Sequence, residues 1–395
     1  MPCGQPCQDK NYTGRRSALI CNIIFMQDIY YIREITETGL SACENADSFL
    51  QSSMWGEFKS RFGWKARAFF VSLVFNNEEI KIPLLVLTRR LLRVFSFAYV
   101  PWGPELPKVF PEEKRPEAAA QLSAMLKPLI ARNAIFIRFD FPWFNVENQE
   151  ECSGIKEQKR RKKEFQSVPG FKKAAAEVQP PDTVIINLDA ACEEILAQMK
   201  PKWRYNISLA AKKGVNTEVC GAEKIEIFYS LLKETAARDG LAIHKIDYYK
   251  TLFDVCAGKQ NVKIYLYLAS HDSDVLGAIA VLFRGSYATY LYGASSNKKR
   301  NLMASYALQW KAMRDAKDSG CVYYDLFGIP PYDDPNHPME GLYRFKTGFG
   351  GSIIHRPGSW DYPYKKPVYG LFNIAERFRK KIFNLKKTSR KDKKR

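Results

Sequence analysis

Residues 287–326 read YATYLYGASSNKKRNLMASYALQWKAMRDAKDSGCVYYDL, which is a strand pattern, a turn, a helix pattern and a second strand pattern in that order. Both ends of this stretch are rich in aromatic and β-branched residues, which strands favour. The segment 302–319 between them carries apolar side chains at helical spacing. Two more strand patterns precede the stretch, at 262–269 and 276–283. We therefore predict an α/β (α+β) unit built on an antiparallel or mixed sheet.

The first half of the chain repeats this order. Strand patterns at 66–75, 80–87 and 92–100 lead to the turn Pro101-Trp-Gly-Pro104, then to a helix pattern at 116–132 and an apolar strand at 134–140. In each half a tyrosine-containing turn precedes the helix, and the strand after the helix ends near an aspartate, Asp140 or Asp325. This duplicated order resembles the GNAT acyltransferase fold, used twice in tandem.

The length of 395 residues is enough for two or three domains at roughly 150 residues each. A polar stretch with a basic run at 156–164 separates the two strand-rich units. We expect residues 1–150, with part of the C-terminal segment, to form the first GNAT-like domain and 182–350 the second. Residues 151–181 are then a basic insertion or linker, 351–375 a C-terminal segment and 376–395 a basic tail. The run at 156–164 is either a solvated face or a contact for RNA or a membrane.

The chain carries 61 Lys and Arg against 42 Asp and Glu, a net charge of +19. This surplus favours a polyanionic partner such as nucleic acid, phosphates or an anionic membrane. Residues 376–395 hold +9 of it. Apolar residues recur there and just before at helical spacing: Leu371, Ile374, Ala375, Phe378, Ile382 and Leu385. The region is either a basic amphipathic helix on an anionic membrane or a helix docked on the core with a disordered tail.

Nine cysteines at irregular spacing, several of them in apolar runs, indicate reduced thiols and a cytoplasmic protein. The sequence contains no CxxC or HExxH motif, so we expect no metal site. The apolar stretch 18–26 is far shorter than the roughly 20 residues that span a bilayer, and a strand pattern follows it. A folded segment is therefore favoured over a signal peptide. Peripheral contact with the inner face of the membrane remains open through the basic tail.

The turn before the helix of the opening stretch, 296–304, contains no glycine. Backbone amides reach a pyrophosphate only where side chains leave room, so this turn disfavours coenzyme A as an acyl donor. His244 and His355 have no Ser, Cys or Asp at a spacing that could link them into a triad. We therefore predict no Ser-His-Asp or Cys-His mechanism.

Two segments combine cations with aromatic residues or glycines. Lys202-Trp-Arg-Tyr-Asn-Ile places Arg204 on a basic helix with interleaved aromatics. Such a helix suits RNA or nucleotide phosphates, but it equally describes an amphipathic surface helix with Trp203 in the core. Gly341-Leu-Tyr-Arg-Phe-Lys-Thr-Gly-Phe-Gly-Gly351 places Lys346 beside a turn with three glycines. That lysine is either a ligand for a phosphate or a developing oxyanion, or an exposed lysine on a glycine-rich hairpin.

Seven segments follow one another across about residues 45–370 and carry a family resemblance. They are Phe49-Leu-Gln-Ser-Ser-Met-Trp-Gly-Glu-Phe-Lys59 with Gly63-Trp64, Tyr99-Val-Pro-Trp-Gly-Pro104, Phe136-Ile-Arg-Phe-Asp140, Lys202-Trp-Arg-Tyr-Asn-Ile207, Glu234-Thr-Ala-Ala-Arg-Asp-Gly240, Tyr324-Asp-Leu-Phe-Gly-Ile329 and Leu342-Tyr-Arg-Phe-Lys-Thr-Gly-Phe-Gly-Gly351. Together and in this order they resemble the FemABX family, peptidyltransferases that use aminoacyl-tRNA to build peptidoglycan cross-bridges.

The resemblance implies two GNAT-like domains with the active site in the cleft between them, and no cofactor. It also implies that the side-chain amine of a diamino acid attacks the ester carbonyl of an aminoacyl-tRNA, so that an amide replaces the ester. The diamino acid belongs to the stem peptide of a peptidoglycan precursor, either nucleotide-linked or lipid-linked. Because the ester is already activated, the protein needs mainly to position the amine, take its proton and stabilise the oxyanion.

The resemblance also assigns residues. Asp140 matches an aspartate near the acceptor amine, and Lys346 matches a lysine near the tRNA ester or its phosphates, so both are expected to be catalytic. Lys59 matches a contact to the precursor's phosphates, and Tyr292 matches an aromatic contact to the precursor.

Arg204 and Lys245 complete the expected substrate-binding set. Where the family often has an arginine after the Arg-Asp-Gly turn, this chain has His244-Lys245. The second domain also has no room for the coiled-coil arm that some members insert.

Two other functions fit parts of the sequence. A double GNAT module with the same donor could acylate a phospholipid head group or a protein N-terminus, and the basic tail suits either acceptor at a membrane. A non-catalytic RNA-binding protein is the third possibility, and the +19 charge alone supports it.

Overall fold

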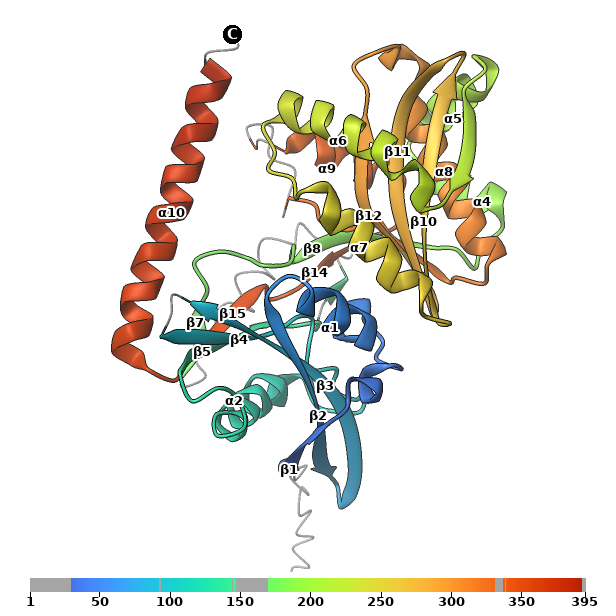
Figure 1. Cartoon of the computed structure of the whole chain (residues 1–395). Helices are drawn as coiled ribbons and strands as arrows, with labels where there is room; N and C mark the ends of the chain where they lie inside the picture. Colours follow the sequence, from blue (N-terminus) through green and yellow to red (C-terminus); the bar gives the residue numbers. More distant parts are fainter. Residues whose placement is uncertain are drawn as a thin grey trace, which may run out of the picture.

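The computed structural model describes residues 30–91, 94–143, 145–146, 170–330, 337 and 339–392, with the side chains of the last helix described up to residue 379. The basic run at 156–164 and the apolar stretch 18–26 lie outside the described residues, and so do most side chains of the tail 376–395. Two sheets, each with helices packed on it, organise the described chain (Figure 1).

The first sheet has the strand order β1-β2-β3-β4-β5-β15-β7. The strands are β1 (Tyr30–Thr38), β2 (Trp64–Phe75), β3 (Glu78–Leu91), β4 (Phe95–Val100), β5 (Ala134–Asp140), β7 (Lys172–Lys173) and β15 (Ser359–Pro363). Strands β1 to β4 form an antiparallel meander, and β5 then pairs parallel to β4. Strand β15 pairs antiparallel with β5, so a late segment of the chain returns to the first sheet.

The second sheet has the order β6-β14-β8-β13-β12-β11-β10-β9. The strands are β6 (Asn145–Val146), β8 (Asp182–Asn187), β9 (Asn216–Cys220), β10 (Val262–His271), β11 (Asp274–Arg284), β12 (Tyr287–Ser295), β13 (Tyr323–Asp325) and β14 (Ser352–His355). Strands β9 to β12 are antiparallel, and β13 pairs parallel to β12. Strand β6 joins this sheet and β7 the first one, so the sheets exchange short strands on either side of 147–169.

Both sheets follow one plan, which confirms the tandem GNAT-like fold. Helix α2 (Arg115–Leu126) connects the parallel pair β4 and β5, and α8 (Ala304–Asp318) connects the parallel pair β12 and β13. The other α-helices in the described residues are α1 (Ser53–Ser60), α4 (Cys192–Gln198), α5 (Pro201–Lys212), α6 (Ile225–Asp239), α7 (Ile246–Ala257), α9 (Glu340–Thr347) and α10 (Lys366–Asp392). Within the described ranges none of them forms a coiled-coil arm.

Three large cores hold the molecule together. One lies under α2 in the first half, and a second lies under α5 and α8 in the second half. The third joins the halves: Phe58 of α1 and Leu85 of β3 pack in one cluster with Phe228 of α6 and Leu252 of α7. The two halves therefore share buried apolar surface, and residues at their boundary are held by both.

Helix α10 leaves the end of β15 and extends along one side of the molecule (Figure 1). Its first turns dock on the first sheet, where Tyr369 is buried and Phe372 packs on Phe136. Arg138 of β5 fixes the next turn by two hydrogen bonds, of 3.0 and 2.9 Å, to the carboxylate of Glu376. Across the described chain, no helix is long and apolar enough to cross a membrane.

Candidate active site between the two halves

Lys59 lies in an aromatic niche at the boundary of the halves. Ser52 caps α1 by accepting a hydrogen bond from the Trp55 amide, and Lys59 lies in the last turn of the helix. Its ammonium is 5.4 to 5.9 Å from the ring centroids of Trp55, Phe58, Trp64 and Tyr248. Burial, with the nearby charge of Arg89, lowers the pKa of Lys59 to about 8. A cation so poorly hydrated gains more from binding an anion than an exposed lysine does.

Tyrosines from α7 and β12 continue this niche. The His244 ring stacks on Tyr248 at 3.8 Å, and Tyr249 meets Tyr292 edge to face at 5.2 Å. The Tyr248 and Tyr292 side chains share a hydrogen bond, and burial raises the pKa of Tyr292 well above its usual value. Burial and the charge of Lys59 lower the pKa of His244.

Lys245 stands at the N-cap of α7, next to His244, and is exposed. The first amides of a helix favour anions, and a cationic side chain at that end adds to the effect. The structure thus gathers three of the four predicted substrate-binding residues, Lys59, Lys245 and Tyr292, around the start of α7. Together they can bind a phosphate on the cations and stack a planar group on the tyrosines.

Asp140 is buried next to this niche. Its carboxylate accepts hydrogen bonds from the hydroxyls of Tyr99 and Ser359 and from the Gln179 amide at 3.1 Å. Only 2% of the residue is exposed, and burial raises the pKa of Asp140 to about 6. The Tyr99 ring in turn lies 6.0 Å from Trp64, which flanks Lys59. Asp140 is therefore connected to the niche through Tyr99.

Asp325 occupies the equivalent place in the second half, at the end of β13. Its carboxylate accepts hydrogen bonds from the Thr183 hydroxyl and from the Phe327 amide at 2.7 Å. Both halves thus end the strand after the connecting helix with a buried aspartate whose carboxylate binds groups from segments distant in the sequence. This parallel gives Asp140 a structural role in addition to any chemical one.

Lys346 is buried at the end of α9. Its ammonium donates to the carbonyls of Phe327 at 3.1 Å and Gly328 at 2.9 Å, and it lies 5.2 Å from the Tyr290 ring centroid. With 5% of the residue exposed, burial lowers the pKa of Lys346 to about 7, against the opposing charge of Asp325. The ammonium has three hydrogens, so one donor is left for a further partner.

The alternative of an exposed lysine on a glycine-rich hairpin is wrong. Residues 340–347 form a helix, and the glycines after it allow close packing. A Cβ on Gly348 would lie 2.1 Å from the Trp203 ring, and one on Gly351 would lie 2.4 Å from the Ile185 carbonyl oxygen. These glycines bring α9 close to α5 and β8 and thereby bury Lys346.

Aromatic contacts connect Lys346 to the first half. Phe327, whose carbonyl binds Lys346, has its ring 5.8 Å from Trp102. The Arg356 guanidinium lies over the same Trp102 ring, 4.1 Å from its centroid. The Gly103 amide donates to the Asp140 carbonyl at 3.2 Å. Asp140 and Lys346 therefore approach one boundary from opposite halves, with Trp102 and Phe327 between them.

Arg204 lies apart from this group. It sits on the exposed side of α5, and its guanidinium donates to the Met199 carbonyl at the end of α4. Its neighbour Trp203 is buried and donates to the Phe345 carbonyl at 2.9 Å, which fastens α5 to α9. The interpretation as an amphipathic surface helix with Trp203 in the core is therefore confirmed, and contact of its outward cations with RNA stays a prediction.

Sequence reasoning missed Tyr248, Tyr99 and Arg356. Tyr248 lies on α7, whose apolar residues do recur at helical spacing, so periodicity could have found that helix. The contacts of Tyr99 with Asp140 and of Arg356 with Trp102 join distant parts of the chain, and no local pattern signals them.

Side chains of the turn and of α6 bind amides in the turn before α8. The Asn297 amide donates to Glu234 at 2.7 Å, and the Lys298 amide donates to the Ser296 hydroxyl at 3.2 Å. These amides are therefore not free to cradle a pyrophosphate. Over the described residues, no group of three or more His, Cys, Asp or Glu side chains could hold a metal ion, and five cysteines are free thiols.

The chain is similar to a known family, to characterised relatives and to a solved structure. The model of the FemAB family matches residues 40–274 and 267–377. The lipid II:glycine glycyltransferase of Staphylococcus haemolyticus (strain JCSC1435) is 24% identical over 399 residues, covering 84% of this chain and 91% of that protein. The enzyme of the same name from Staphylococcus aureus (strain MRSA252) is 22% identical and covers 88% and 95%. The crystal structure of FemX superposes with a TM-score of 0.68 at 21% identity, over 86% of this chain and 100% of that one.

Proposed function

The chain belongs to the FemAB family, and on that basis we propose that it is an aminoacyltransferase of peptidoglycan synthesis. It moves an amino acid from aminoacyl-tRNA to the side-chain amine of a diamino acid in the stem peptide of a precursor. Its relatives are named for glycyl transfer to lipid II, so glycine and a lipid-linked precursor are the first substrates to test. The observation that carries the proposal is the niche of Lys59, Lys245 and Tyr292 between the halves. Lys346 is buried in the second half, where Phe327 connects it to the first half.

The acceptor side is assigned to the niche. Lys59 and Lys245 bind the precursor's phosphates, and the tyrosines contact its sugar or base. Partial burial among aromatic rings strengthens the contact of Lys59 with phosphate, because the surrounding rings lower the local dielectric.

Lys346 and Asp140 are assigned to the chemical step. The neutral amine attacks the ester carbonyl, the carbonyl oxygen becomes an oxyanion, and the tRNA ribose oxygen leaves with a proton while an amide forms. The third hydrogen of the Lys346 ammonium stabilises the oxyanion. Asp140, ionised at neutral pH, holds Tyr99 and supplies negative charge that stabilises the positive charge developing on the attacking nitrogen. It accepts the amine's proton only when one of its hydroxyl donors gives way.

The donor side is assigned to α5. Lys202, Tyr205 and Lys212 are exposed, with Tyr205 64% exposed, and a cationic face with an aromatic side chain suits RNA. The amide of Lys200 donates to the Gly348 carbonyl at 2.9 Å, so α5 and the end of α9 are held together. RNA bound along α5, with Arg204 at its edge, is thereby kept in a fixed position relative to Lys346.

Membrane contact and the absence of a cofactor complete the proposal. A lipid-linked acceptor requires a peripheral contact with the inner face of the cell membrane, and we assign it to α10. Aminoacyl-tRNA is the co-substrate. The closed turn before α8 supports a donor other than coenzyme A.

The test is transfer by the purified protein from labelled aminoacyl-tRNA to lipid-linked and nucleotide-linked precursors. We expect RNase-sensitive label in the stem peptide. Lys59→Gln should raise KM for the precursor about tenfold, because a charge-assisted phosphate contact is lost. Lys65→Gln, an exposed lysine on β2, is the matched control and should leave KM unchanged.

Two results would overturn the proposal. One is the absence of RNase-sensitive transfer to either precursor with any amino acid. The other is label that extracts into chloroform as an aminoacylated phospholipid, which would establish the alternative acceptor.

A further inference from the structure

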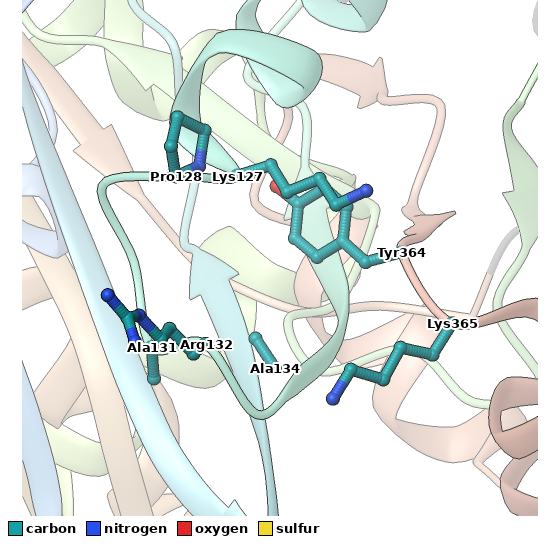
Figure 2. Close-up of a pocket in the computed structure, with 7 residues that line it drawn as sticks. All are labelled: Lys127, Pro128, Ala131, Arg132, Ala134, Tyr364 and Lys365. Carbon is teal, nitrogen blue, oxygen red and sulfur yellow. The ribbon is translucent and has the colours of Figure 1, made fainter.

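An open pocket of about 370 Å³ lies at the foot of α10. It is lined by Lys127, Pro128, Ala131, Arg132, Ala134, Tyr364 and Lys365 (Figure 2). Three of the seven are cations, and none is acidic. Residues 127–133 connect α2 to β5, and Lys365 directly precedes α10, so two distant segments contribute the cationic side chains that line the pocket.

The three cations have no acidic partner in the described ranges. None of Lys127, Arg132 and Lys365 forms an ion pair there, and the Lys365 ammonium lies 5.8 Å from the Phe95 ring. Lys127 follows the last turn of α2 and complements the helix dipole. That explanation covers neither Arg132 nor Lys365. A cluster of like charges around a hollow is stabilised when an anion such as a phosphate enters it.

The helix that starts at this pocket carries an exposed apolar stripe. Leu371, Ile374 and Phe378 are 72%, 54% and 61% exposed, and their spacing places them on one face of α10. The docked face is a different one, formed by Tyr369, Phe372 and Glu376. The sequence continues the apolar spacing at 382 and 385 and is strongly basic around it.

We propose that the pocket binds the phosphate of an anionic phospholipid while the stripe of α10 enters the head-group region of the same membrane. Charge complementarity selects the occupant, because the stripe alone fits any apolar surface, but the stripe beside unpaired cations fits an anionic bilayer. Weak apolar insertion and electrostatic attraction are individually marginal and jointly sufficient for stable peripheral binding. The inference rests on the proposed function in one respect, since it names the membrane partner of an enzyme with a lipid-linked acceptor.

The test is flotation of the full chain with vesicles of phosphatidylcholine alone or with about 30% phosphatidylglycerol, at about 0.15 M salt. The pocket variant is Lys127→Ala/Arg132→Ala/Lys365→Ala. The matched control is Lys233→Ala/Lys263→Ala/Arg314→Ala, which removes two lysines and one arginine from the exposed surface of the second half. A stripe variant is Leu371→Asn/Phe378→Asn.

We expect the protein to bind the anionic vesicles and not the neutral ones. The pocket variant should lose about one hundredfold in affinity, because each of its three cations contributes about fivefold near the surface. The stripe variant should lose binding as well, and the control should change by less than about threefold. Equal losses in the pocket variant and the control would overturn the pocket, because binding would then follow net charge alone.

Free phosphate provides the second arm. Inorganic phosphate at about 10 mM should not displace the protein from vesicles, because a free anion lacks the apolar contribution. Displacement would overturn the lipid assignment in favour of a free-phosphate site. Flotation with vesicles does not depend on aminoacyl transfer. The pocket variant should retain aminoacyl transfer to a nucleotide-linked precursor. The docking inference and the proposed function therefore fail on different measurements.

Discussion

At the scale of single residues, burial of the charged Lys346 ammonium destabilises the folded state. Burial lowers its pKa to about 7, so the folded protein binds fewer protons than the unfolded chain between pH 7 and about 10. Stability is therefore lowest where Lys346 is charged, below pH 7, and rises as the pH increases toward 10. Two hydrogen bonds to carbonyls offset part of this cost.

Lys346→Met should therefore raise Tm by a few degrees at pH 6 to 7, with the gain shrinking toward pH 10, because methionine has no charge to bury. Transfer should fall about one hundredfold, as expected for the loss of an oxyanion donor. Calorimetry across this pH range checks the first effect and the transfer assay the second. Lys65→Met serves as an exposed control. A Tm difference that does not vary with pH would contradict the assignment of the shift to burial.

Asp140 behaves in the opposite sense. Its pKa is raised to about 6, so the stability contributed by its protonated form is complete below about pH 4 and is lost as the pH rises through 6. Relative to Asp140→Asn, the native protein should lose about 3 kcal/mol over that rise. Denaturant unfolding at several pH values measures the difference, with the exposed Asp318→Asn as control. Parallel stability curves for the native protein and the Asp140→Asn variant would show that the carboxylate is not desolvated.

At the scale of elements, one arginine fastens α10 to the first sheet. Arg138 is buried and binds Asp361 of the neighbouring strand at 2.6 and 2.9 Å and Glu376 of α10 at 3.0 and 2.9 Å. The Tyr369 hydroxyl donates to Asp361 at 3.0 Å and closes the network. The start of α10 is therefore positioned by charge as well as by packing.

Glu376→Gln should loosen α10 while the sheets stay intact. Arg138 keeps Asp361 but loses half of its carboxylate partners, so we expect a loss of about 1–3 kcal/mol. Limited trypsin digestion should cut faster at Arg377 and Arg379, with little change in circular dichroism of the remaining protein. Glu340→Gln, which breaks the exposed pair with Arg344 on α9, should change stability by less than about 1 kcal/mol. Equal digestion rates for both variants would refute the role of Glu376.

Helices and strands could be predicted from the sequence where one pattern of residues dominated a segment. The strands at 262–269, 276–283 and 287–293 were predicted from their runs of aromatic and β-branched residues, and α8 was predicted from helical spacing because it buries one continuous face. The segment 341–351 was not, because its glycines are typical of a hairpin but serve contacts with Trp203 and Ile185 that only the folded chain creates. The candidate site was likewise predictable only in part. Lys59 and Tyr292 came from motif resemblance, whereas their link through Tyr248 depends on how the halves pack.

At the scale of the whole molecule, the shared core makes the niche a property of both halves. Phe58 of α1 is fully buried, and its ring lies 4.8 Å from Tyr248 of α7. Because α1 belongs to the first half and α7 to the second, separating the halves would expose this contact and release Lys59 from its rings. We therefore expect the native protein to unfold in one calorimetric transition, and two resolved transitions would contradict a shared core.

Phe58→Ala tests the connection between that core and substrate binding. The cavity should cost about 3–5 kcal/mol, and because Tyr248 loses its packing partner, KM for the precursor should rise severalfold. Phe110→Ala is the matched control, since Phe110 is buried to a similar degree but lies in the core of the first half alone. Both variants should lower Tm to a similar extent, yet only Phe58→Ala should weaken precursor binding. A similar rise in KM for both would mean that general destabilisation, and not the boundary between the halves, controls the niche.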